Sequence, residues 1–171
     1  MNQAVIIGYG NPLRRDDGIG WRAAELAEAE LRDAGVEVVR THQLTPELAL
    51  KLEHAETVVF LDAAEGDAPG FLRFQFVDAA ESDAWTHDLS PGQLLRLAYR
   101  LYGFEPAAFL ITGGAQTTDH GEGLSEVAER CAVRMAALAA ALAAPNITRV
   151  AAQPSDLLAS RAAREYSRPI A

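Results

Sequence analysis

A glycine-rich turn with two adjacent carboxylates is the part of this sequence best suited to chemistry. Residues 8–20 read GYGNPLRRDDGIG and follow an apolar, strand-like run at residues 4–7. A turn of this kind usually binds an anion, because free helix N–H groups and the helix dipole favour negative charge. Asp16 and Asp17 would repel a phosphate. The turn therefore predicts a cation site.

Further residues could complete a metal site at the same edge of the protein. Asp62 directly follows the apolar run 57–61, His42 follows the preceding apolar run, and His87 lies in a loop ahead of a predicted helix. Ligands of open parallel sheets gather at the carboxyl ends of the strands. Two carboxylates with one imidazole suit divalent Zn, Ni, Mn or Fe. The alternative is that Asp17 and Asp62 are ordinary turn or helix-start residues.

Composition and charge favour one globular domain in a reducing compartment. The chain has 171 residues, of which 49% are hydrophobic and 23% are charged. Cys131 is the one cysteine, so neither an intrachain disulfide nor a cysteine metal cluster can form. The net charge of −9 argues against nucleic acid or an anionic membrane as a partner. We find no secretion signal and expect a cytoplasmic protein, with a domain at residues 1–144 and a weakly packed tail at 145–171.

The elements that must position these residues alternate between strand and helix, which is typical of an α/β domain. The sequence predicts a single three-layer sandwich, with a mostly parallel five-stranded sheet and helices on both faces. The predicted strands are residues 5–8, 36–39, 57–61, 71–77 and 107–111, and the predicted helices are residues 18–32, a segment from Thr45 to about His54, one that starts at Ser90-Pro91, and residues 124–143.

The fourth strand, residues 71–77, is predicted to run antiparallel beside the third. Only residues 63–70 connect the two, and this connection is too short for the crossover that parallel strands require. The period-two alternation of the side chains indicates that one face of this strand is wetter. We also expect the pair Gly113-Gly114 to break the fifth strand.

Residues 8–13 and 16–20 resemble the opening signature of the hydrogenase maturation endopeptidases, which trim the C-terminus of the large subunit of nickel–iron hydrogenases. That signature is a G-x-G-N-x-L turn, then D-[DE]-x-x-G, and then an Asp after a buried strand. Residues 113–114 and 121–127 resemble a later segment of the family, so the similarity spans residues 4–142. The resemblance implies a five-stranded sheet sandwiched by helices, in agreement with the pattern above.

The resemblance also implies which residues form the site. The family's metal-binding carboxylates fall on Asp17 and Asp62, and either could act as the base in catalysis. The third ligand is expected at His87, which lies in a T-H-x-[LM] pattern found in some members. Other members carry this histidine after a Ser-Pro pair, where this chain has Gly92. His42 stays an alternative, because it follows a strand at the same sheet edge.

The resemblance to the maturation endopeptidases also implies that the metal arrives with the substrate. The enzyme recognises nickel that is already inserted into the precursor, although other divalent ions can occupy the site in crystals. Nickel would polarise the scissile carbonyl or activate a water molecule. We therefore expect a monomeric endopeptidase whose partner is the hydrogenase large-subunit precursor.

Two other functions compete with this hypothesis. One is a nickel-sensing chaperone that binds the precursor without cutting it. The other is a dinucleotide-binding domain, which is disfavoured because Leu13 stands where that fingerprint needs its third glycine. A cysteine protease is not indicated, because Cys131 lies among apolar residues of a predicted helix.

Overall fold

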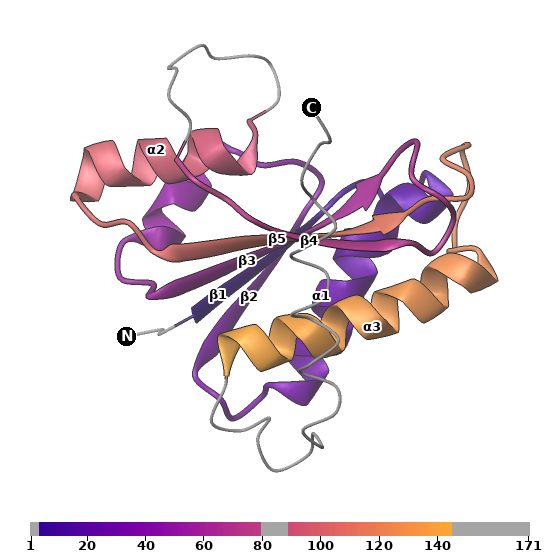
Figure 1. The fold of residues 1–171 in the computed structure, drawn as a ribbon, viewed down its shortest axis with the longest axis horizontal. Coiled ribbons are helices and arrows are strands. Elements are labelled where there is room, and N and C mark those ends of the chain that lie inside the picture. The colour runs from indigo at the N-terminus through magenta and orange to yellow at the C-terminus, as the bar shows by residue number, and fades with distance from the viewer. Residues whose placement is uncertain (1–3, 80–88, 145–171) are drawn as a thin grey trace, which may run out of the picture.

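Apolar runs along the chain form the strands of the sheet. The computed structural model describes residues 4–79 and 89–144. Over these residues, five strands lie in the order β2-β1-β3-β5-β4, and all but β4 are parallel to their neighbours (Figure 1). β4 occupies an edge and runs antiparallel to β5. The strands are β1 (Ala4–Tyr9), β2 (Val36–Thr41), β3 (Thr57–Ala64), β4 (Leu72–Phe76) and β5 (Ala107–Gly114).

Helices cover both faces of this sheet, which confirms the three-layer α/β sandwich predicted from the sequence. α1 (Ile19–Glu30) and α3 (Glu126–Ala143) pack together on one face, whereas α2 (Pro91–Tyr102) and the 3₁₀ helix η2 (Pro46–Leu52) cover the other (Figure 1). A shorter 3₁₀ helix, η1 (Arg15–Gly18), joins β1 to α1. No helix in the described part of the chain is both long and apolar enough to cross a membrane.

Small residues bring α1 very close to the sheet. Gly8 on β1 faces Gly20 on α1, so a Cβ on Gly8 would meet the carbonyl oxygen of Gly20. A Cβ on Gly20 would in turn meet the carbonyl oxygens of Leu61 and Tyr9. These glycines therefore serve close helix–sheet packing, and they hold the turn between β1 and α1 at a fixed place beside the sheet.

The alternation of side chains along β3 decides which face carries Asp62. Val59 and Leu61 belong to the core under α1 and α3, whereas Val58 and Phe60 belong to the core under α2 and η2. Successive side chains of a strand point to opposite faces. Asp62 therefore points to the face that α2 and η2 cover.

The structure corrects the partner of the fourth strand. β4 is antiparallel, as the short connection predicted, but it pairs with β5 and not with β3. β5 itself pairs with β3 in parallel, from Thr57 opposite Ala107 to Ala64 opposite Gly114, and this moves β4 one strand outward. The loop that leaves β3 reaches across, where the Gly70 N–H donates to the Gly114 carbonyl oxygen at 2.8 Å.

The pair Gly113-Gly114 ends β5 but does not break it, contrary to the expectation from the sequence. A Cβ on Gly113 would meet the side chains of Ile19 and Met135 at 2.6 and 2.9 Å, and one on Gly114 would meet the Ala68 carbonyl oxygen. Both glycines are therefore packing positions, where helices and a loop approach the strand.

Two further boundaries differ from the prediction. β3 continues to Ala64, so Asp62 lies inside the strand and not after it. The second helix is 3₁₀ and not α over Pro46–Leu52. The predicted start of α2 is confirmed: Ser90 and Gln93 form a capping box, with the Ser90 N–H donating to Gln93 Oε1 at 2.8 Å. The predicted tail, residues 145–171, lies outside the described residues.

Candidate functional site

The first carboxylate of the turn, Asp16, is a structural residue. Its side chain is fully buried and accepts hydrogen bonds from the N–H groups of Gln116 (2.9 Å), Thr117 (3.3 Å) and Ser125 (2.6 Å) and from the Ser125 hydroxyl (2.8 Å). Burial alone raises the pKa of Asp16, but these hydrogen bonds outweigh burial and lower it below its usual value. Asp16 is thus held by donors of the protein itself, and Asp17 is the carboxylate of the turn that the sequence analysis assigned to the metal.

Backbone hydrogen bonds add to the connection that Asp16 makes between its own turn and the loop that precedes α3. The Arg15 N–H donates to the Gly121 carbonyl oxygen, and the Gly121 N–H donates to that of Leu13, both at 2.9 Å. Arg15 adopts a left-handed conformation, with φ of 46°, which is rare for a residue with a side chain. The turn at residues 10–18 is therefore anchored to the loop that precedes α3.

The second carboxylate, Asp17, lies with Asp62 at the carboxyl end of the sheet. Asp17 is half-buried, and its Oδ2 accepts a hydrogen bond from the Asn11 N–H at 3.0 Å. Asp62 is also half-buried, and its Oδ1 accepts from the Ala63 N–H at 2.8 Å. The two carboxylates are close enough for the charge of Asp17 to act on Asp62. The structure therefore brings together the two carboxylates predicted from the sequence.

Asp62 has an unusual protonation equilibrium. Burial is the main reason that its pKa is raised to about 6, and the negative charge of Asp17 adds to the effect. Hydrogen bonds from Tyr9 and from the Ala63 N–H partly oppose this rise. Burial therefore causes most of the rise, and repulsion between the two carboxylates causes the smaller part.

Tyr9 is a site residue that the sequence analysis missed. Its hydroxyl donates a hydrogen bond to the Asp62 carboxylate, and burial together with the charge of Asp62 raises the pKa of the phenol. Tyr9 is thus a neutral donor at neutral pH. The available signal was its position between Gly8 and Gly10, at the end of an otherwise apolar strand.

Of the two histidines predicted as candidate ligands, the structure describes His42 and does not describe His87. His42 is exposed, and its ring lies edge-on to Trp21 with the ring centroids 5.4 Å apart. His87 lies outside the described residues. Within residues 4–79 and 89–144, no group of three His, Cys, Asp or Glu side chains is placed to hold a metal ion. The third ligand therefore stays a prediction.

Cys131 is a core residue, in agreement with the interpretation of the sequence. It is buried among the residues that join α3 to the sheet, and burial raises the pKa of its thiol. A thiol with a raised pKa is a poor nucleophile, because only the thiolate attacks readily. The reactive groups of the described site are therefore oxygen groups.

The pair of carboxylates suits a divalent cation. Asp17 and Asp62 offer oxygen ligands, and a cation between them would offset both their repulsion and the burial of Asp62. A carboxylate with a pKa of about 6 is also well matched to accept a proton near neutral pH. The described residues can thus supply part of a metal coordination sphere and a general base.

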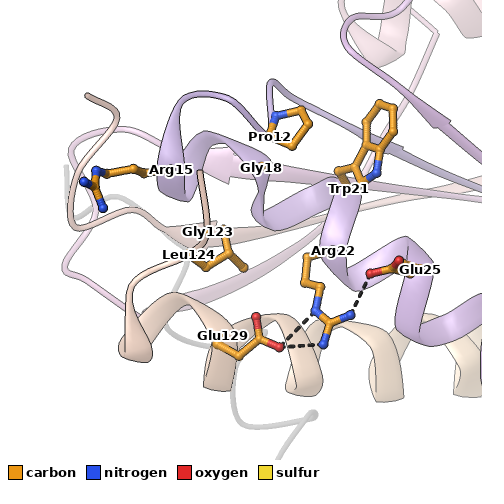
Figure 2. Close-up of a pocket in the computed structure, with 9 residues that line it drawn as sticks. All are labelled: Pro12, Arg15, Gly18, Trp21, Arg22, Glu25, Gly123, Leu124 and Glu129. Atoms are coloured by element: carbon orange, nitrogen blue, oxygen red, sulfur yellow. Dashed lines mark hydrogen bonds and ion pairs between the residues drawn. The ribbon is translucent and has the colours of Figure 1, made fainter. Parts of the chain in front are cut away.

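A pocket of about 330 Å³ opens beside the same turn (Figure 2). Arg22 of α1 points towards α3, where its Nε and Nη2 bind Glu129 Oε1 at 2.9 and 2.8 Å; its Nη1 binds Glu25 at 2.6 Å. The pocket thus combines the paired charges of Arg22, Glu25 and Glu129 with apolar walls. It is lined by Pro12, Arg15, Gly18, Trp21, Arg22, Glu25, Gly123, Leu124 and Glu129.

Solved structures share this fold, whereas no family model and no curated protein matches the chain. The [NiFe] hydrogenase maturation protease HycI from Thermococcus kodakarensis KOD1 is 24% identical with a TM-score of 0.67, over 83% of this chain and 92% of that one. The hydrogenase 2 maturation peptidase from Thaumarchaeota archaeon SCGC_AB-539-E09 is 26% identical with a TM-score of 0.59, over 80% and 94%.

A third structure, the hydrogenase maturating endopeptidase HybD from E. coli, is 21% identical with a TM-score of 0.61, over 78% of this chain and 87% of that one. The α/β fold described above is thus the fold of hydrogenase maturation proteases. The resemblance that the sequence motifs indicated is confirmed at the level of the fold.

The different roles of the adjacent carboxylates can be separated by stability. In Asp16→Asn the amide faces donors that its NH₂ group cannot satisfy, so the free energy of unfolding should fall by about 2–4 kcal/mol. Asp17→Asn keeps an oxygen acceptor for the Asn11 N–H and should cost less than about 1 kcal/mol. Urea denaturation of the two variants tests this, and equal losses would contradict the assignment.

Asp62→Asn should stabilise the protein at neutral pH and not at acidic pH. The folded-state pKa of Asp62, about 6, exceeds the unfolded value of about 4, so its contribution is fully present below about pH 4 and is lost as pH rises through about 6. An amide does not ionise. The variant should therefore be more stable than wild type above about pH 6, by at most about 3 kcal/mol.

Urea denaturation at a series of pH values from about 4 to about 8 measures this difference. Asp33→Asn serves as the control, because Asp33 is exposed beyond the end of α1. A difference between Asp62→Asn and wild type that stays constant over the series would show that Asp62 does not titrate in this range.

Proposed function

We propose that this chain is an endopeptidase that removes the C-terminal extension of a nickel–iron hydrogenase large-subunit precursor after nickel insertion. The observation that carries the proposal is the pair Asp17 and Asp62, half-buried together at the carboxyl end of a sheet whose fold is that of maturation proteases. The signature residues of the turn and of the segment before α3 support the same activity.

The carboxylates would act on nickel carried by the substrate. Asp17 and Asp62 supply oxygen ligands on the protease side, and the predicted third ligand is His87, with His42 as the alternative. Docking through the metal would bring the scissile peptide next to these carboxylates only when the precursor is loaded. Nickel therefore enters as part of the substrate, which makes insertion of the metal a condition for cleavage.

The proton transfers of hydrolysis fit the properties of Asp62. An ionised Asp62 with one carboxylate oxygen free of the metal could accept a proton from the attacking water and return it to the leaving amine. Tyr9 stays protonated and donates to Asp62, so it orients the carboxylate and does not compete for the proton. Nickel would polarise the scissile carbonyl or assist the water.

The pocket beside the turn gives a polypeptide substrate a place to bind. Gly18, which lines it, directly follows Asp17, so the pocket lies next to the turn that carries this carboxylate. Trp21 and Leu124 offer apolar contacts there (Figure 2). An aromatic wall with paired charges around it is typical of a site that holds a side chain of a partner.

Cleavage of a nickel-loaded precursor is the direct test. Incubation with the wild type should shorten the precursor, as read by mass spectrometry, and a nickel-free precursor should stay intact. Asp17→Asn and Asp62→Asn should fold and yet lose at least about 100-fold in rate, because an amide is a weaker ligand and is not a base. Asp33→Asn, an exposed control, should cleave normally.

The same assay separates the protease from a nickel-sensing chaperone. A wild-type protein that binds the loaded precursor tightly but leaves its mass unchanged is a chaperone, and the proposal would then be wrong. Full activity in Asp17→Asn would leave Asp17 with a structural role alone.

Trp21→Ala should weaken substrate binding and leave the chemical step unchanged. Loss of the indole from the pocket should raise KM roughly tenfold, with kcat within about twofold of wild type. Tyr99→Ala on α2 is the matched control, because Tyr99 is an exposed aromatic residue that does not line the pocket. A fall in kcat at constant KM would instead place Trp21 in the catalytic machinery.

A further inference from the structure

The hydroxyl of Thr112 on β5 is buried and has no hydrogen-bond partner in the described part of the chain. A buried hydroxyl without a partner destabilises a protein, because it loses its hydrogen bonds to water. Valine has the same shape and would carry no such penalty. Within residues 4–79 and 89–144, this position therefore holds a polar group without a partner.

Thr112 lies directly beside Asp62. The two residues are register partners across β3 and β5, and paired residues of neighbouring strands project to the same face about 5 Å apart. Ala108 of β5 belongs to the core under α2, which places the side chain of Thr112 on that face, together with that of Asp62. A small rotation of the Asp62 carboxylate would bring it within reach of the hydroxyl.

The neighbour of Thr112 on the other side is already occupied. Arg73 of β4 is the register partner there, but its guanidinium binds Asp67 through two contacts, Nε to Oδ2 at 3.2 Å and Nη2 to Oδ1 at 2.6 Å. Asp62 has spare capacity, because a carboxylate can accept about four hydrogen bonds and this one accepts from Ala63 and Tyr9. Asp62 is thus the fitting acceptor for Thr112.

We propose that Thr112 is a positioning residue for Asp62, whose hydroxyl donates to the Asp62 carboxylate when substrate engages it. The inference rests on the proposed function, because the hydrogen bond is expected to form when the loaded precursor binds. In the free protein one carboxylate oxygen of Asp62 accepts from the adjacent Ala63 N–H. Engagement of the carboxylate by substrate turns it, and Thr112 then holds the working orientation.

The test compares Thr112→Val with Thr112→Ser. The valine variant should melt at the same temperature as wild type or a few degrees higher, because an unpaired buried hydroxyl is removed. Its kcat for the loaded precursor should fall roughly 10- to 100-fold, as expected for a lost hydrogen bond to a charged group. Thr112→Ser keeps the donor and should recover most of kcat.

Thr57→Val is the matched control, since Thr57 lies at the opposite end of β3. It should leave kcat unchanged. A valine variant at position 112 with wild-type kcat overturns the proposal. So does a valine variant that is destabilised, because the hydroxyl would then have a partner in the free protein.

A measurement without precursor keeps the two proposals apart. Ni²⁺ alone is titrated into wild type, Asp62→Asn and Thr112→Val, and the heat of binding is measured by calorimetry. Asp62→Asn should abolish the carboxylate-dependent binding, and Thr112→Val should weaken it roughly tenfold. If the wild type cleaves no precursor, the endopeptidase function fails, and this titration still decides on Thr112. Unchanged affinity in Thr112→Val, or Ni²⁺ binding that does not need Asp62, overturns it.

Discussion

The buried carboxylate of Asp16 is the interaction on which the candidate site depends. In η1 successive side chains point about 120° apart, because a 3₁₀ helix has three residues per turn. Asp16 can therefore turn inward while Asp17 remains at the surface. The hydrogen bonds that Asp16 accepts from the segment before α3 fix this rotation. The contacts of Asp16 thus determine where the neighbouring Asp17 is placed.

The second constraint is an electrostatic imbalance that the fold maintains. Asp62 is half-buried beside Asp17, and none of the ion pairs between described residues involves either of them. The partners of Asp62 are a neutral phenol and a backbone N–H, which orient the carboxylate without neutralising it. A salt bridge would stabilise the free protein and would also occupy the oxygens. The described residues therefore leave the negative charge of Asp17 and Asp62 without a compensating cation.

Sequence patterns predicted most of the fold because its elements carry local signals. The apolar run of β3, the capping residue Ser90 and the short connection before β4 were each sufficient for a correct element or direction. The order of the strands was not predicted correctly. The neighbour of β4 depends on where β5 inserts into the sheet, and no local pattern encodes that. Gly113-Gly114 was predicted to break β5, but both glycines allow close packing against the strand. Glycine is typical of both situations, so the sequence does not tell them apart.

The site was predictable to the extent that its residues are polar and its motif is known. Asp17 and Asp62 were predicted as site residues, and the structure places them near each other. The sequence alone does not distinguish Asp16 from Asp17, and only the hydrogen-bond partners of each do so. Tyr9 was missed because an aromatic residue at the end of an apolar strand usually belongs to the core. His87 lies outside the described residues, so its role rests on the sequence motif.

The bonds that anchor the turn also determine when the site can exist. Asp16 is synthesised early, yet its partners Gln116, Thr117 and Ser125 follow it by 100 to 109 positions. A chain growing on the ribosome holds both acids long before the residues that orient them have been made. Until then the Asp16 carboxylate lacks the donors that bind it, and the turn that carries Asp17 is not yet anchored to the segment before α3. The site is therefore a product of the completed domain, and unfinished chains lack it.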